Sequence, residues 1–272
     1  MSKKRVLFVV QEMLPYLEQS SMAKLVRYLA PYTQKNDYEI RLLMPRFGII
    51  NEKRHRLHEV VRLSGINITV ADEDNPLLIK VASLPEAKMQ VYFLDNEDLF
   101  YRKSVFRDDM NKFHDDNDTR TAFFCKGVLE TVVKLGWKPD IIHCHGWMTS
   151  LIPMYLKTQY KDQPIYQDTK TIYSLYENAF PEVFAEGFEK KVDFDDDPLD
   201  SEHLDIFKAG DFKSLNMAGI KYSDALIVGN ENIDPAFKEE ISSVEKPVLG
   251  AQSESEYLDA YVDFFTKVLE EG

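Results

Sequence analysis

A short buried strand that ends in polar residues is the sequence feature that most constrains this fold. Residues 140–151 read D-I-I-H-C-H-G-W-M-T-S-L. The two isoleucines form the body of a strand, and Gly146 marks the corner that follows it. Thr149 or Ser150 is then expected to cap the next helix. Ligands bind at the carboxyl ends of the strands in an open α/β sheet, so we expect a site here.

Strands and helices alternate along most of the chain. Apolar runs predict strands over residues 5–10, 39–44, 89–94, 171–175 and 225–228, besides the central strand. Helical spacing predicts helices over 22–29, ending before Pro31, and over 119–135, 151–156, 212–222 and 254–269. The stretches I-N-I-T-V and L-L-I-K-V predict two further strands joined by the turn A-D-E-D-N-P, and an acidic loop is expected from about 187 to 211.

This order of elements predicts the fold class. Strands that alternate with helices form a doubly wound, mainly parallel, Rossmann-like α/β sheet. We expect a single domain over residues 1–272, because no repeat or low-complexity linker divides the chain. The carboxyl-terminal amphipathic helix, at about 254–270, is expected to pack back on that domain, since its apolar face must be buried.

Charge and cysteine content exclude several classes of partner. The 272 residues carry a formal net charge of −13, and Lys and Arg, not Asp and Glu, neutralise phosphates. We therefore expect neither nucleic acid nor a membrane as a partner. The two cysteines form no C-x-x-C pair, and the apolar run V-L-F-V-V near the start is too short for a signal peptide. A cytoplasmic location is the expectation.

Two groups of polar residues invite a functional interpretation. Ser20 and Ser21 stand at the start of a helix that follows a strand and a loop, a geometry that receives phosphates, although capping is their simpler role. His143 and His145 share one face of the central strand, but no third metal ligand stands at a convincing spacing, so we expect hydrogen-bonded histidines and no metal. Cys144 points to the opposite face and is expected in the core.

Five stretches resemble, in order, one enzyme family. They read V-L-F-V-V-Q-E-M-L-P-Y, R-L-L-M-P-R-F-G, D-N-D-T-R-T-A-F-F, P-D-I-I-H-C-H-G-W-M-T-S-L and K-T-I-Y-S-L-Y-E-N-A-F. Together they resemble the amino-terminal half of bacterial glycogen synthase and plant starch synthase, glycosyltransferase family 5. The resemblance runs from Arg5 to about Ile233, and its specificity lies in the order and spacing of all five stretches.

The resemblance implies a GT-B architecture, in which two Rossmann-like domains face each other across a cleft. The family transfers glucose from ADP-glucose to the non-reducing end of an α-1,4-glucan, with retention of configuration and without a metal or other cofactor. Its amino-terminal domain chiefly holds the acceptor, and its second domain supplies most nucleotide contacts. In this chain Asp95, Arg102, Asp108 and Asp109 lie in the stretch that borders the family's acceptor cleft. The second domain is expected to be absent.

The chain departs from the family where the chemistry is expected. The family's K-T-G-G-L becomes Glu18, Gln19, Ser20, Ser21 and Met22, which replaces a phosphate-binding lysine with a carboxylate. At about 4 Å and an effective dielectric of about 20, this exchange changes the interaction by several kcal/mol. Lys24 is nearby in sequence, but nothing places it correctly.

Two family histidines are also replaced. H-D-W-H-T becomes H-G-W-M-T, with Met148 at the second histidine, and T-I-H-N becomes S-L-Y-E, with Tyr176 at the histidine. A thioether is only a weak acceptor and cannot donate a hydrogen bond. Neither Met148 nor Tyr176 is therefore assigned a catalytic role. The residues that we single out for ligand binding are Glu18, Gln19, Ser20, Ser21, His143, His145, Trp147, Thr149 and Glu177.

Two functions fit these features. In the first, the chain is a noncatalytic relative of glycogen synthase that binds a glycan, regulates, or docks a protein partner or a second copy of itself. In the second, it transfers glucose from ADP-glucose to an α-1,4-glucan together with a separate chain that supplies the nucleotide-binding domain. The substitutions favour the first, with an α-glucan or maltooligosaccharide as ligand.

Overall fold

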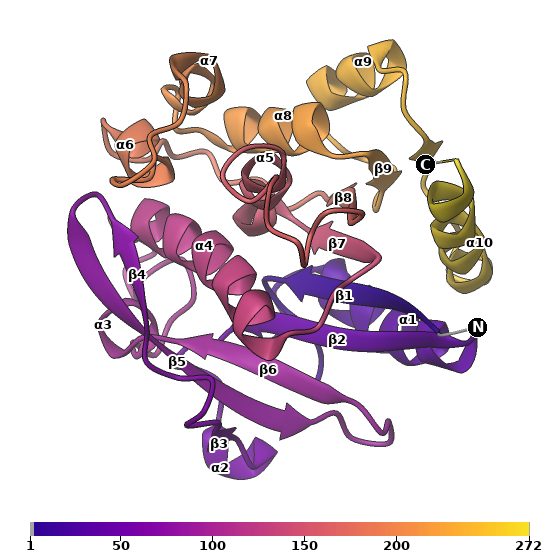
Figure 1. Ribbon diagram of the computed structural model, residues 1–272, viewed down its shortest axis with the longest axis horizontal. Helices are drawn as coiled ribbons and strands as arrows, with labels where there is room; N and C mark the ends of the chain where they lie inside the picture. The colour runs from indigo at the N-terminus through magenta and orange to yellow at the C-terminus, as the bar shows by residue number, and fades with distance from the viewer. Residues whose placement is uncertain (1–2, 272) are drawn as a thin grey trace.

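The computed structural model describes residues 3–271 and contains a ten-stranded sheet (Figure 1). The strands are β1 (Lys4–Val10), β2 (Tyr38–Pro45), β3 (His58–Glu59), β4 (Ile66–Val70), β5 (Glu73–Ser83), β6 (Gln90–Asp95), β7 (Ile141–His145), β8 (Lys170–Leu175), β9 (Ala225–Val228) and β10 (Val248–Leu249). Their order is β10-β9-β8-β7-β1-β2-β6-β5-β3, with β4 paired to β5 outside this path. Pairing is parallel from β10 to β6 and antiparallel around β5, which confirms the predicted fold class.

Helices cover both faces of the sheet. They are α1 (Ser21–Lys35), α2 (Glu52–His55), α3 (Glu97–Phe100), α4 (Asn117–Leu135), η1 (Trp147–Thr149), α5 (Ile152–Lys157), α6 (Phe188–Val192), α7 (Ser201–Leu204), η2 (Asp205–Phe207), α8 (Phe212–Tyr222), α9 (Pro235–Ser243) and α10 (Tyr257–Glu270). Figure 1 shows α4 and α5 in front of the sheet and α1 behind it. Helix α10 packs beside α1, on the sheet face that carries Phe8.

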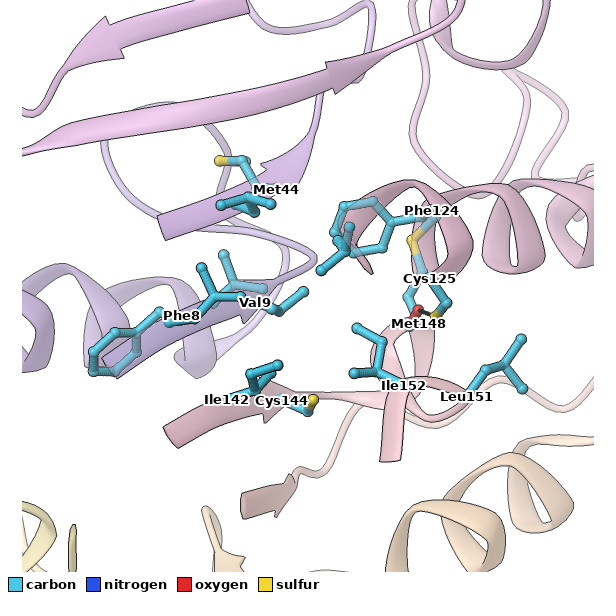
Figure 2. Packing of buried hydrophobic residues seen from close by; sticks show 14 of the residues in the cluster. Phe8, Val9, Met44, Phe124, Cys125, Ile142, Cys144, Met148, Leu151 and Ile152 are labelled. Atoms are coloured by element: carbon cyan, nitrogen blue, oxygen red, sulfur yellow. Dashed lines mark hydrogen bonds between the residues drawn. The ribbon is translucent and has the colours of Figure 1, made fainter. Parts of the chain in front are cut away.

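The central strand β7 divides its side chains between these two faces. His143 points to the α10 side, where its ring centroid lies 5.4 Å from that of Phe265. Cys144 points to the other side and is buried near Cys125 of α4, as Figure 2 shows. Both cysteines are free. The predicted alternation of the two histidines and Cys144 is therefore confirmed, and both faces of β7 are core.

The β4–β5 hairpin turns earlier than predicted. The expected turn A-D-E-D-N-P is wrong, because only Ala71 and Asp72 separate the paired residues Val70 and Glu73. Both turn residues have positive φ, 51° and 64°, the backbone that matches the twist of a two-residue hairpin. The polar residues after the turn can therefore continue the strand at the exposed tip of the hairpin.

Helix α1 continues through Pro31 to Lys35, beyond its predicted end. The apolar face explains this, because Ala30 and Thr33 remain buried on either side of the proline. The hydroxyl of Thr33 also donates to the carbonyl of Leu29 at 2.9 Å. Burial and this extra hydrogen bond offset the missing N–H of a proline inside a helix.

The predicted cap of α5 is wrong. Thr149 belongs to the η1 turn, and its hydroxyl donates to the carbonyl of Gly146 at 2.8 Å. No side chain caps α5, whose N-cap is Leu151. A proline at the start of α5 has no N–H that would need a cap, which makes the missing cap less costly. By contrast, Ser20 caps α1 as predicted, since its hydroxyl oxygen accepts from the N–H of Met22 at 3.3 Å.

Two further predictions for the carboxyl-terminal half need correction. The segment 187–211 is not simply an acidic loop, because it contains α6, α7 and η2 and buries Phe188 and Phe207. Strand β9 is not the last strand, since β10 pairs with it in parallel register. Strand β10 has 2 residues, and helices α6 and α7 have 5 and 4. Elements this short contain no apolar repeat that could be recognised in a sequence.

Helix α10 packs its apolar face against the sheet. Phe265 is buried, with its ring centroid 6.2 Å from that of Phe8 and 6.3 Å from that of Tyr38. Near the carboxyl end of α10, Thr266 hydrogen-bonds the hydroxyl of Tyr38 at 3.0 Å. Tyr32 of α1 also donates to Asp259. These contacts tie α10 to both α1 and β2.

Candidate functional site at the carboxyl edge of the sheet

A cavity of about 310 Å³ lies beyond the carboxyl ends of β1, β7 and β8, where ligands bind in open α/β sheets. We call it the edge cavity. Its lining combines carboxylates, amides and hydroxyls with aromatic rings. The residues are Gln11, Glu12, Gln19, Ser20, Phe106, Arg107, Phe113, Trp147, Glu177, Asn178, Ala179 and Phe180.

Glu12 fills the anion-binding position at the start of α1. Its buried carboxylate accepts from the backbone N–H of Ser20 at 2.9 Å, and also from the N–H of Gln19 and the hydroxyl of Ser20. Burial raises the pKa of Glu12 above its ordinary 4.5, while the hydrogen bonds from Ser20 and Gln19 oppose this rise. The backbone N–H groups of the N-cap residue Ser20 and of Gln19 before it are therefore already bound by a side chain of the same chain.

Gly146 lets the end of β7 approach this loop closely. It has φ of +80°, and a Cβ there would lie 2.6 Å from Cε of Met22 and 2.7 Å from Oε1 of Gln11. Only glycine meets both conditions without strain. Glycine is therefore required at position 146 for the end of β7 to pack closely against α1 and the residue that follows β1.

Arg107 is the one cationic side chain among the residues described around the edge cavity. Its guanidinium forms two hydrogen bonds of 2.6 Å with the carboxylate of Glu182. It also lies 5.4 Å from the ring centroid of Phe113. The pair joins the segment before α4 to the segment after β8, and its charge is already neutralised.

The aromatic residues of the edge cavity pack against one another. Trp147 is only 2% exposed, and its ring centroid lies 4.9 Å from those of both Phe106 and Phe180. Phe180 in turn stacks on Phe113 at 4.9 Å. Their ring faces are therefore largely used by protein contacts, and Trp147 packs the corner after β7.

His143 and His145 lie outside the edge cavity, under α10. Both are fully buried, with ring centroids 3.8 Å apart. His143 Nε2 hydrogen-bonds Ser174 Oγ at 2.7 Å, and His145 Nδ1 hydrogen-bonds Tyr176 Oη at 2.7 Å. Burial lowers the pKa of both imidazoles, that of His145 to about 3. They are neutral packing groups in the folded chain.

The other predicted ligand-binding residues divide between several places. Gln19, Ser20, Trp147 and Glu177 line the edge cavity. Glu18 is exposed beside it, and Thr149 is buried. Ser21 lines a second cavity between α1 and α10. The structure thus brings together four of the nine predicted residues.

The replaced family positions are both buried. Met148 is inaccessible to solvent, and Figure 2 shows it between Cys125 of α4 and the start of α5. The backbone carbonyl of Met148 accepts from the thiol of Cys125 at 3.1 Å. Tyr176 is also buried, as the partner of His145. Neither side chain lines the edge cavity.

Two of the four charged residues expected near an acceptor, Asp95 and Arg102, form ion pairs with other residues. Asp95 is buried, with Lys80 Nζ at 2.8 Å and Arg46 Nε at 3.3 Å from its Oδ2. Arg102 donates to Asp116 at 2.8 Å. Asp108 accepts backbone hydrogen bonds within its own loop, and Asp109 is exposed. None of the four predicted residues lines the edge cavity described above.

Sequence reasoning missed Glu12, Arg107 and Asn178. Glu12 carried a usable signal, because it follows the predicted strand 5–10 directly, at the edge where ligands bind. Arg107 and Asn178 lie in segments without regular structure, so no periodic pattern places them. Their positions depend on long-range contacts, such as the bond between Arg107 and Glu182.

Comparison with known proteins identifies the family. The family model described as starch synthase catalytic domain matches residues 5–249. The chain belongs to this family. A glycogen synthase of Chlorobaculum parvum is 34% identical over 241 residues, which cover 88% of this chain and 47% of the relative. A glycogen synthase of Chlorobium luteolum is 41% identical over 177 residues, which cover 65% of this chain and 36% of the relative. The chain therefore spans under half the length of the curated relatives it matches.

A solved structure supports the starch synthase fold. The catalytic domain of starch synthase IV from Arabidopsis thaliana, bound to ADP and acarbose, matches with a TM-score of 0.67 and 16% identity. The match covers 98% of this chain and 50% of that one. This likeness concerns the fold alone. The resemblance predicted from the five sequence stretches is confirmed by the family match.

Between residues 3 and 271, none of the helices is both long and apolar enough to cross a bilayer. Within the same residues, His, Cys, Asp and Glu side chains form no group of three or more that could hold a metal ion.

Proposed function

We propose that this chain is a glycogen-synthase-related module that binds an α-glucan and does not transfer glucose by itself. The observation that carries the proposal is the position of Glu12, whose buried carboxylate binds the backbone N–H groups of Gln19 and Ser20 directly before α1. A donor phosphate at these amides would meet a like charge. Two charges about 4 Å apart repel by about 4 kcal/mol at an effective dielectric of about 20.

The nearest lysine does not replace the missing family lysine. Lys24 Nζ forms an ion pair of 2.7 Å with Glu254, in the segment that leads to α10. Both side chains are exposed, so the pair is weak, yet it leaves the local charge balanced. Arg107 is balanced in the same way by Glu182. These pairs support the absence of a phosphate site.

The histidines of this chain are also poorly placed for proton transfer at the edge cavity. His143 and His145 are neutral and buried under α10, away from the edge cavity. Met148 replaces the family histidine and is itself buried. General acid–base catalysis needs a titratable group within hydrogen-bond reach of the reacting atoms.

An α-glucan is the ligand that the family membership favours. The resemblance assigns acceptor binding chiefly to the amino-terminal half of the enzyme, and residues 5–249 match that family. The relatives are named glycogen synthases. We further propose a cytoplasmic location and a protein partner, or a second copy of this chain, as a component of the functional assembly.

A split glucosyltransferase is the second candidate. The edge cavity at the carboxyl ends of β1, β7 and β8 is the observation that favours it, because ligands bind at this edge in open α/β sheets. In that case a separate chain would have to supply the charges that hold ADP-glucose. Glu12 and the paired Lys24 argue against this candidate.

Thermal unfolding with two ligands separates these candidates. Ligands raise the thermal midpoint of the state that binds them. We expect maltotriose to raise the midpoint of the purified chain and ADP-glucose to leave it unchanged. A rise with ADP-glucose would favour the split enzyme. No rise with either ligand would contradict the glucan-binding proposal and favour a protein partner.

A further inference from the structure

A second cavity, of about 370 Å³, lies between α1 and α10. We call it the α1–α10 cavity. Leu25 and Tyr28 line it from α1, and Tyr257 and Leu258 line it from α10. Asn230, which follows β9, also lines it. Its volume is at the lower end of the range for small-molecule sites, so a ligand of one or two sugar rings would fit.

Tyrosines dominate the surface of the α1–α10 cavity. Tyr28 is 53% exposed, which leaves its ring available to a ligand. Tyr257 lies edge-on to Tyr261, with ring centroids 6.1 Å apart and an interplanar angle of 88°. Partial burial raises the pKa of Tyr257, with Tyr28 and Glu254 as further contributors. A tyrosine ring offers an apolar face beside a polar hydroxyl, as an amphipathic ligand requires.

The polar groups around the tyrosines are uncharged or paired. Asn230 Nδ2 donates to Ser21 Oγ at 3.1 Å. Lys24 and Glu254 are bound to each other at 2.7 Å and cancel each other's charge. The pair leaves no net charge beside the tyrosines that would attract a charged ligand. The lining therefore favours an uncharged ligand with many hydroxyl groups.

We propose that the α1–α10 cavity binds the end of an α-glucan, with one glucose ring stacked on Tyr28. This inference rests on the proposed function, because it names the place where that glucan binds. The edge cavity is less suitable, since Phe113 and Phe180 stack on each other and Glu12 and Glu177 add negative charge. Residues 252–261 contribute to the α1–α10 cavity and lie beyond the matched residues 5–249.

Calorimetric titration of the full chain with maltotriose tests the inference. We expect Tyr28→Ala to weaken binding about fivefold, the size of one aromatic stacking contact. Tyr28→Phe keeps the ring and should bind like the unmodified chain. Tyr101→Ala removes another exposed tyrosine, outside both cavities, and should also leave the affinity unchanged.

The outcomes separate the inference from the proposed function. Binding that resists Tyr28→Ala but weakens in Gln19→Ala would overturn the inference and leave the glucan-binding function in place. A chain that binds no maltotriose at all would overturn both. Circular dichroism of each variant establishes that a loss of affinity is not a loss of fold.

Discussion

The carboxylate of Glu12 accepts a hydrogen bond of 2.9 Å from the backbone N–H of Ser20, the N-cap residue of α1. The hydroxyl of Ser20 donates to the same carboxylate. A helix start of this kind attracts anions, and here the anion is a side chain of the protein itself. This relationship is the basis of our proposal that no donor phosphate binds here.

Glu12→Gln should change how stability depends on pH. Burial raises the pKa of Glu12 above 4.5, so between that value and its raised pKa the folded chain binds more protons than the unfolded chain. Stability from this group is present at low pH and is lost as pH rises through the raised pKa. Glutamine should remove this loss. Chemical denaturation from pH 4 to 8 measures the free energy of unfolding of both proteins. If this free energy changed with pH equally in the variant and in the unmodified chain, the raised pKa of Glu12 would be refuted.

His145→Gln should reduce acid sensitivity. The pKa of His145 is lowered by burial to about 3, below the ordinary 6.5, so the unfolded chain binds the proton first as pH falls. The stabilisation by the neutral imidazole is fully present above about pH 6.5 and decreases below that pH. The free energy of unfolding should fall by about 3 kcal/mol between pH 7 and pH 4.

The free energy of unfolding at pH 7 and at pH 4 tests this prediction. The variant loses packing at both pH values, so the quantity to compare is the difference between the two. An equal difference in variant and unmodified chain would show that His145 already titrates normally in the folded state.

Gly146→Ala should destabilise the chain by about 1–3 kcal/mol, the usual cost of a strained backbone, and more if the neighbours cannot move. The new Cβ would lie 2.6 Å from Met22 and 2.7 Å from Gln11. Gly136→Ala is the matched control, because φ there is +60° but nothing lies within 4 Å of the added Cβ. In urea denaturation, the free energy of unfolding should be lower for Gly146→Ala than for Gly136→Ala. The reverse order would contradict the packing described at Gly146.

Met148→His should destabilise the fold without creating a site. Restoring the family histidine places a polar ring in the core beside Cys125, where Met148 is fully buried. An unpaired buried polar group costs about 1–3 kcal/mol. Met148→Leu, which keeps an apolar side chain of similar volume, is the control. Equal thermal midpoints for the two variants would show that position 148 has room and partners for an imidazole.

The sequence predicted the sheet and the central elements because their patterns are local. Helix 212–222 has the predicted bounds, and strand β7 lies where the isoleucines placed it. The helix through Pro31 was cut short because its continuation depends on burial of Ala30 and Thr33 against the rest of the fold. The hairpin turn was misplaced because two residues with positive φ carry no glycine or asparagine signal.

The site was harder to predict than the fold. Alternation along β7 identified the face that carries His143 and His145, yet it could not show that α10 covers that face. The family resemblance identified positions 18–22 as the replaced phosphate-binding motif. The role of Glu12 could not be predicted, because it depends on the loop after β1 folding back so that Gln19 and Ser20 reach its carboxylate. Such contacts join residues through tertiary structure, which periodicity does not encode.

Transfer of glucose from ADP-glucose to glycogen is the measurement that tests the central claim most directly. Purified chain is incubated with glycogen and ADP-glucose that carries a radioactive glucose, and the label in precipitated glycogen is counted. We predict no incorporation above a protein-free control, because no free cation or accessible imidazole among the described edge-cavity residues serves the donor. Incorporation that rises in proportion to the amount of this chain would contradict the account.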